Sequence, residues 1–264
     1  MNRIIVVIIV ILSLGSCTSK FQKVMKNKDT DYKIKMAEEY YKQKKYVNAQ
    51  QLFESVINFV KGTPRYEELY LMYANSYYYD KDYENAENLF KTFIEYFPNS
   101  TKTEEVEYLR AYTYFLRSPK AELDQTTTNR TIQLMQSFID AHPTSPRVKA
   151  ATETIDACRA KLELKDYKTA TLYFDLALYR AAAISYGLLS DGYPDSKDAD
   201  KYKLLTLKSY YKFAENSFVE KQKERFDKVI EEYNDFVDRF SDSPLLPEAK
   251  KIKTQTDNIL KNIK

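Results

Sequence analysis

One eight-residue phrase occurs four times in the chain and marks helix junctions. It reads FIEYFPNS at 93–100, FIDAHPTS at 138–145, LSDGYPDS at 189–196 and FVDRFSDS at 236–243. Proline ends a helix because it lacks a backbone N–H, and serine is a preferred N-cap for the helix that follows. The phrase therefore predicts a repeated junction between two helices, and this repetition constrains the fold more than any other feature.

The segments between these junctions carry apolar residues at helical spacing. The helix that ends within the first phrase is predicted to have one apolar face, formed by Ala86, Leu89, Phe90, Phe93, Ile94 and Phe97. The chain has only 4 Gly among 264 residues. Glycine is the usual residue of tight β-hairpins and close-approach loops. The composition therefore argues against sheet-rich and nucleotide-binding folds and favours an all-α fold.

The helix pairs resemble the tetratricopeptide repeat, a unit of roughly 34 residues with small residues where its two helices cross. The first small position of each unit holds Ala37, Ala74, Ala111, Ala170 and Leu207, and the second holds Ala49, Ala86, Thr131, Ala182 and Val229. Leu207, Thr131 and Val229 depart from the pattern. The resemblance implies an all-α tetratricopeptide-repeat solenoid of about five helix pairs, with a linker helix and a C-terminal capping helix.

The expected layout follows from these patterns. The N-terminal part divides into a signal peptide at 1–16, a lipidated flexible tether at 17–30 and repeats 1–3 at 31–145. The C-terminal part divides into a linker helix at 146–165, repeats 4–5 at 166–244 and a capping helix at 245–264. The tether is predicted because it is polar and rich in lysine, and an insertion at 118–126 separates the helices of the third repeat.

The N-terminus carries the pattern of a secretory signal. Arg3 precedes an apolar run at 4–12 that is too short to span a bilayer as a permanent helix. The following Leu-Gly-Ser-Cys at 14–17 resembles the bacterial lipobox, which implies cleavage before Cys17 and its acylation, palmitate included. Thr18 after the cysteine resembles an outer-membrane, periplasm-facing address. The alternative is a plain secretory signal with an incidental cysteine.

Few residues carry candidate chemistry. The chain has 41 Lys plus Arg and 38 Asp plus Glu, so no basic excess suggests nucleic acid as a partner. The one histidine, His142, is predicted to be a solvated turn residue, and Cys158 a small buried hydrophobe. No cofactor motif or metal-ligand spacing is present in the sequence. We expect no enzyme, no cofactor and no metal.

The first helix of each tetratricopeptide unit lines the concave side of the repeat. Its predicted peptide or substrate groove consists of Ile34, Tyr41, Leu71, Asn75, Tyr78, Tyr79, Tyr108, Tyr112 and Phe115. This lining is aromatic and mostly uncharged, and tyrosine hydroxyls can pair with a peptide backbone. The alternative is that the rings are buried between units. In the last unit, Lys208, Tyr211 and Lys212 form a more charged surface that predicts docking of a different partner.

The whole set of features resembles one lipoprotein family. The chain resembles the BamD (ComL-like) family of the outer-membrane β-barrel assembly machinery in several features taken together. They are the lipobox-like segment, the tether, the repeats with their phrase, and the residues Ser118-Pro119 and Leu123-Asp124-Gln125. The resemblance implies a non-catalytic scaffold, lipid-anchored at the periplasmic face of the outer membrane. It implies that the C-terminal repeats bind a BamA-like barrel subunit within the assembly complex, and that the N-terminal repeats bind unfolded β-barrel precursors.

An alternative stays open at this point. Other tetratricopeptide-repeat lipoproteins of the cell envelope coordinate peptidoglycan or envelope processes, and the repeat motif alone does not separate the two readings. Co-purification from membranes separates them, because a barrel protein favours assembly and a peptidoglycan enzyme favours the alternative.

Overall fold

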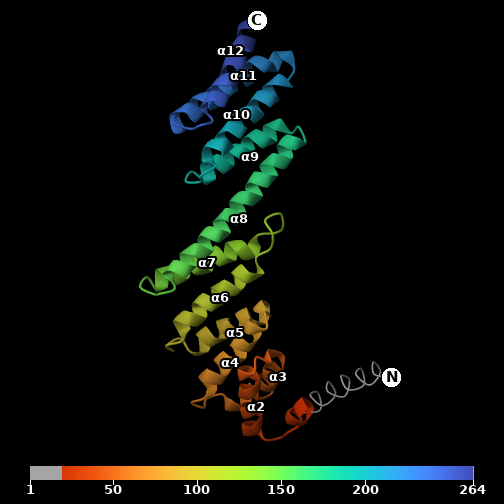
Figure 1. The fold of residues 1–264 in the computed structure, drawn as a ribbon, viewed down its shortest axis with the longest axis vertical. Helices are drawn as coiled ribbons and strands as arrows, with labels where there is room; N and C mark the ends of the chain where they lie inside the picture. The colour runs from red at the N-terminus through yellow and green to blue at the C-terminus, as the bar shows by residue number, and fades with distance from the viewer. Residues whose placement is uncertain (1–19, 264) are drawn as a thin grey trace, which may run out of the picture. The chain divides into compact units, whose positions relative to one another are not determined.

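The computed structural model describes residues 20–263, which are mostly helical and contain no β-strand. The all-α prediction is confirmed. In chain order the elements are α2 (Thr30–Lys42), α3 (Tyr46–Val56), the 3-10 helix η1 (Ile57–Val60), α4 (Tyr66–Tyr79), α5 (Tyr83–Tyr96), α6 (Thr103–Arg117), α7 (Thr126–Ala141), α8 (Val148–Asp175), α9 (Tyr179–Gly192), α10 (Ala199–Glu215), α11 (Val219–Arg239) and α12 (Leu246–Asn262), as labelled in Figure 1.

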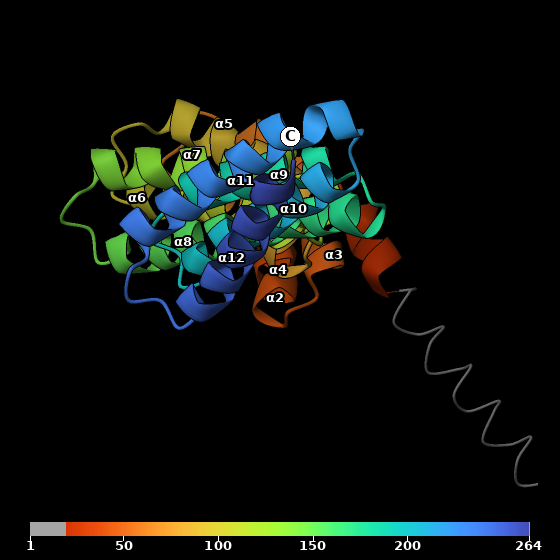
Figure 2. The ribbon, with the colours of Figure 1, turned by 90° about the horizontal axis from the view of Figure 1, so that it is seen from above.

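Two compact units divide the described residues. Unit 1 comprises 20–119 and 125–158, and unit 2 comprises 120–124 and 159–263, so that α8 contributes to both. In unit 1 each helix from α2 to α7 packs on the next, and in unit 2 the same holds from α9 to α12. Both views show α12, at the C-terminal end, against α11 (Figures 1 and 2). These packed helix pairs are those of a tetratricopeptide-repeat solenoid.

The small positions predicted at the helix crossings are buried. Their exposed fractions are at most 1% for Ala37, Ala49, Ala74, Ala86, Ala111, Thr131, Ala170, Ala182, Leu207 and Val229. Small side chains let two helix axes approach closely, and larger neighbours then fill the remaining space. In unit 1 those neighbours include Phe53, Phe90 and Phe93, which are fully buried. The larger Leu207 and Val229 are accommodated at the same places in unit 2.

The repeated phrase forms the same turn each time, although the serine does not cap the helix directly. Each helix begins three residues after the serine, and the serine Oγ instead accepts the N–H two residues on. The same Oγ donates to a carboxylate from the first helix of the pair that has just ended. The four bonds are Ser100 to Glu67 (2.5 Å), Ser145 to Glu104 (2.5 Å), Ser196 to Glu163 (2.5 Å) and Ser243 to Asp200 (2.6 Å).

The structure differs from two expected boundaries. Residues 20–25 are helical, and Phe21 and Val24 are buried in the core of unit 1. This part of the expected tether is therefore packed, because its two apolar side chains lie one helical turn apart. The expected linker helix does not end at 165 but continues as α8, since no proline or glycine interrupts 148–175. Cys158, on α8, is fully buried as predicted.

None of the helices in residues 20–263 combines the length and apolar character that a membrane crossing requires. The predicted signal peptide and the predicted lipidation residue, Cys17, lie outside the described residues.

Candidate functional site

Seven of the predicted groove residues are at least partly exposed and lie on the first helices of the three pairs in unit 1. They are Tyr41 on α2, Leu71, Asn75, Tyr78 and Tyr79 on α4, and Tyr112 and Phe115 on α6. We call this set the tyrosine surface. Tyr79 is the most open of them, with 51% of its surface exposed. The side chains share a side of their helices because residues three or four positions apart face the same way.

Two predicted groove residues belong to the core instead. Ile34 is 1% exposed and packs in the core of unit 1, and Tyr108 is 6% exposed and packs against Phe138. Both were placed in the groove by their position in the repeat. Their neighbours cover them: α2 packs on α3, and α6 packs on α7. Ile34 and Tyr108 are therefore corrected to packing residues.

The rings of the tyrosine surface contact one another and two tyrosines that the sequence analysis had assigned to no site. Tyr46, the first residue of α3, lies 5.8 Å from Tyr41 and 5.4 Å from Tyr79 between ring centroids. Tyr83, the first residue of α5, lies 5.8 Å from Tyr78. Their place at the start of each second helix was the sequence signal that could have identified them. The rings thus support one another across helices, at centroid distances typical of favourable aromatic pairs.

The hydroxyls of Tyr41 and Tyr78 stay protonated over a wide pH range. Burial, with neighbouring tyrosines adding to it, raises the pKa of Tyr41 and of Tyr78 to about 12. A protonated tyrosine hydroxyl is both a donor and an acceptor of hydrogen bonds. Beside Tyr41, the buried Oδ1 of Asn75 has no hydrogen-bond partner among the described residues. An orphaned buried carbonyl costs free energy, and such groups are rare in folded proteins.

The expected docking residues of unit 2 are largely engaged in packing. Lys208 forms an ion pair with Glu248 of α12 at 2.8 Å, and Lys212 pairs with Glu215 one turn further along α10 at 2.7 Å. Tyr211 packs its ring 5.7 Å from Phe226 of α11. All three side chains are half-buried. The sequence pattern did not reveal these partners because two of them come from other helices.

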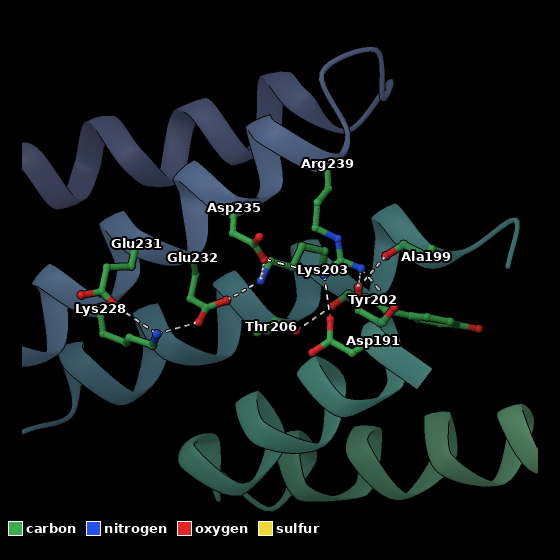
Figure 3. Close-up of polar contacts among 11 residues, drawn as sticks. Asp191, Ala199, Tyr202, Lys203, Thr206, Lys228, Glu231, Glu232, Asp235 and Arg239 are labelled. Atoms are coloured by element: carbon green, nitrogen blue, oxygen red, sulfur yellow. Dashed lines mark hydrogen bonds and ion pairs between the residues drawn. The ribbon is translucent and has the colours of Figure 1, made fainter. Parts of the chain in front are cut away.

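A buried ionic cluster joins α10 to α11 in unit 2 (Figure 3). Lys203, 6% exposed, donates to Glu232 at 2.6 Å and also pairs with Asp235. Lys228 lies 2.9 Å from Glu231 and 3.1 Å from Glu232. Sequence analysis missed this cluster, because a lysine in a charged helix gives no sign of being buried. Since each buried charge is paired, the cluster is satisfied internally and serves to hold the two helices together.

The surroundings of His142 also differ from the prediction. Its Nε2 lies 2.6 Å from Glu107 Oε2, and its ring packs 5.2 Å from Phe138. The predicted solvated turn residue is therefore half-buried and paired, because Glu107 is brought to it from α6, 35 residues earlier. Within residues 20–263 no cluster of three histidine, cysteine or acidic side chains is arranged to hold a metal ion.

These observations define a class of protein first: a tetratricopeptide-type helical repeat whose first helices in unit 1 carry partly exposed aromatic side chains. The sequence comparison then defines the family, since residues 26–226 match the YfiO family, described as outer membrane lipoprotein. The chain belongs to this family, which confirms the BamD-like resemblance. No curated protein matches the sequence.

Solved structures similar to this chain are helical repeats. The TPR2AB domain of yeast Sti1 in a complex with pHSP90 is 11% identical, with a TM-score of 0.39, covering 86% of this chain and 98% of that one. A putative kinesin light chain of Podosopora anserina with nearly identical TPR-like repeats is 10% identical, with a TM-score of 0.33 over 86% of this chain and 95% of that one.

Proposed function

We propose that this protein is a non-catalytic lipoprotein scaffold of the outer-membrane β-barrel assembly complex, which binds a BamA-like barrel subunit and unfolded outer-membrane protein precursors. The observation that carries the proposal is the match of residues 26–226 to an outer membrane lipoprotein family. The lipobox-like sequence at 14–17 supports a lipid anchor at Cys17, on the periplasmic face of the outer membrane.

The tyrosine surface supports the binding of precursor segments. An unfolded precursor presents unpaired backbone groups and alternating apolar side chains. Tyrosine can bind both features, because its ring packs on apolar side chains and its hydroxyl forms a hydrogen bond with a backbone group. The free energy for insertion would come from the folding of the substrate.

The test is crosslinking of a peptide that carries the C-terminal strand of a β-barrel protein and a photoreactive group. Tyr78→Ala combined with Tyr112→Ala is expected to reduce capture about tenfold, the effect of losing about 1.4 kcal/mol of contact. The matched control is Tyr32→Ala, which removes an exposed tyrosine from α2 outside this surface. Unchanged capture by the double variant, with helicity intact by circular dichroism, would reject the tyrosine surface as the binding site.

A detergent pulldown of the full-length lipoprotein tests the assembly role itself. Recovery of a large barrel protein as the main partner supports the proposal. Recovery of a peptidoglycan enzyme without a barrel protein would instead identify an envelope-coordinating lipoprotein and refute it.

A further inference from the structure

Unit 2 contains a depression of about 440 Å³ between α9, α10 and α11, on the side of α10 away from Lys208, Tyr211 and Lys212. Its wall is mixed, with aromatic rings from α10 and charged side chains from the other two helices. The lining residues are Arg180, Tyr210, Phe213, Lys221, Glu224, Arg225, Lys228 and Glu231.

Two guanidinium groups in this depression have no carboxylate partner in the described part of the chain. Arg225 stacks over Phe213 at 4.1 Å from the ring centroid and donates to the Ser217 hydroxyl, but forms no ion pair. Arg180, on the facing helix α9, forms neither an ion pair nor a hydrogen bond with any residue in 20–263. Stacking on Phe213 fixes the plane of the Arg225 fork and leaves its remaining N–H groups available.

The other seven arginines of residues 20–263 fall into two groups: Arg130 and Arg159, which are exposed and form no ion pair, and five that are paired. These five pair with a carboxylate from an earlier helix: Arg65 with Glu38, Arg110 with Glu87, Arg117 with Glu84, Arg147 with Glu105 and Arg239 with Asp191. An arginine that faces another helix is therefore usually matched by an acid. In the depression, two arginines converge without one.

The other charges of the depression neutralise each other. Lys221 pairs with Glu224 at 3.2 Å, and Lys228 pairs with Glu231 at 2.9 Å. The two arginines thus remain as uncompensated positive charge at the depression, with Arg225 half-buried and Arg180 exposed. A carboxylate is the complementary group, because a guanidinium binds it through two parallel hydrogen bonds.

An adjoining depression of about 480 Å³ extends this surface along α9. It shares Tyr210, Lys228 and Glu231 with the first depression and carries two exposed aliphatic side chains, Ile184 and Leu188. Exposed apolar side chains beside a recess are typical of protein contact sites. The other charged residues of this adjoining depression are paired within unit 2; they are Asp191, Lys203, Glu232 and Asp235. A peptide that crosses both depressions therefore meets uncompensated positive charge at one end and aliphatic side chains at the other.

We propose that these two depressions form a docking site for an acidic segment of a partner protein. Carboxylates of the segment bind Arg180 and Arg225, and an adjacent aliphatic side chain packs on Ile184 and Leu188. A peptide fits better than an anionic membrane, because the arginines line a recess that an extended segment can enter and a flat layer of headgroups cannot. The site does not depend on the proposed assembly function, since it is defined by chemistry that any acidic protein segment can supply.

The test uses the full-length protein in detergent and two labelled synthetic peptides, one carrying Glu-Asp-Leu-Leu and the other Gln-Asn-Leu-Leu. By fluorescence anisotropy, the acidic peptide is expected to bind about tenfold more tightly than its amide counterpart. Arg180→Glu combined with Arg225→Glu is expected to abolish that preference, and Arg225→Lys to reduce it, because lysine keeps the charge but not the fork. The matched control reverses two exposed charges on α12, Lys250→Glu with Lys251→Glu, and is expected to retain the preference.

Three results would overturn the proposal. The first is equal or absent binding of the two peptides to the unaltered protein. The second is an equal loss of binding in the α12 control, which would mean that only net charge matters. The third is that phosphatidylglycerol vesicles displace the acidic peptide, and that their binding is lost when Arg180 and Arg225 are replaced. This result would assign the site to a lipid headgroup. Circular dichroism of each variant establishes that the helices are intact.

Discussion

At three turns between paired helices, a residue with a side chain adopts the left-handed backbone conformation that glycine usually supplies. Lys44, Lys81 and Ala177 have φ values of 59°, 67° and 58°. A β-carbon in this conformation approaches the following carbonyl and costs free energy. The turns are held by backbone bonds, such as that from Ala177 N–H to Phe174 O at 3.0 Å. The repeat therefore stores backbone strain at positions that a glycine would relieve.

Ala177→Gly is expected to raise the free energy of unfolding by about 1 kcal/mol, because it removes the β-carbon clash. The control is the same substitution inside a helix, Ala181→Gly on α9, which is expected to lower it by about 1 kcal/mol through greater backbone freedom. Urea unfolding followed by circular dichroism measures both. A loss of stability in Ala177→Gly would show that the turn carries no such strain.

Tyrosine burial predicts a stability loss at alkaline pH. Tyr41 and Tyr78 have pKa values of about 12 in the folded protein, against an ordinary value of 10.0. Below pH 10 the proton is bound in both states and the full stability is present. As pH rises from 10 toward 12, the unfolded chain loses its protons first, so that unfolding becomes easier.

Tyr41→Phe with Tyr78→Phe is expected to reduce this alkaline loss, because neither ring can then ionise. Urea unfolding of the variant and of the unaltered protein at about pH 9 and about pH 11 measures the difference. Tyr32→Phe, at an exposed position on α2, serves as the control and should not change it. An unaltered pH dependence in the double variant would contradict the assignment.

At the scale of helix pairs, buried charge holds α10 against α11. Lys203 lies between Glu232 and Asp235, and its side chain is 7% exposed. Removing one member of a buried ion pair leaves the other charge without a partner, whereas replacing both by apolar groups of similar size is often tolerated. The cluster in Figure 3 should therefore behave as one unit.

Lys203→Met alone is expected to lower the free energy of unfolding by ~1–3 kcal/mol, because the buried Glu232 loses one of its two lysine partners and keeps only the half-exposed Lys228, at 3.1 Å. Adding Glu232→Leu should recover much of this loss, since Lys228 keeps its other partner, Glu231, at 2.9 Å. Chemical unfolding of the single and double variants gives the comparison. If the double variant is no more stable than the single one, the buried ion pair between Lys203 and Glu232 does not account for the stability of the α10–α11 contact.

At the scale of the whole molecule, the helix pairs divide into two compact units, and the proposed function adds a membrane anchor to them. The anchor depends on Cys17, which lies outside the described residues. Within 20–263 the chain supplies no membrane-crossing helix. In the proposed function, acyl chains at Cys17 provide the membrane attachment.

Cys17→Ala is expected to block processing and acylation, so that unprocessed precursor accumulates and no palmitate is incorporated. Cell fractionation and metabolic labelling with palmitate measure these changes. Cys158→Ala, which alters the buried cysteine of α8, should leave labelling intact. Continued tight membrane association of the Cys17 variant without accumulated precursor would count against lipidation.

Much of the fold was predictable because its signals are local. The spacing of Phe90, Phe93 and Phe97 predicts a helical face, and all three pack in the core of unit 1. The candidate site was predictable only in part. Helical spacing placed Tyr78 and Tyr108 in the same groove, but Tyr78 is partly exposed while Tyr108 is buried against Phe138. Spacing alone does not state how far a neighbouring helix covers each ring.

The sequence by itself determined that the chain is a series of paired helices, because apolar periodicity, alanines at the crossings and the Ser-containing junctions act over a few turns of one helix. The tertiary structure decided which side chains remain available. It paired His142 with Glu107, buried Lys203 between two acids and left Arg180 and Arg225 without any. These outcomes depend on contacts between residues far apart in the chain, which no local pattern encodes.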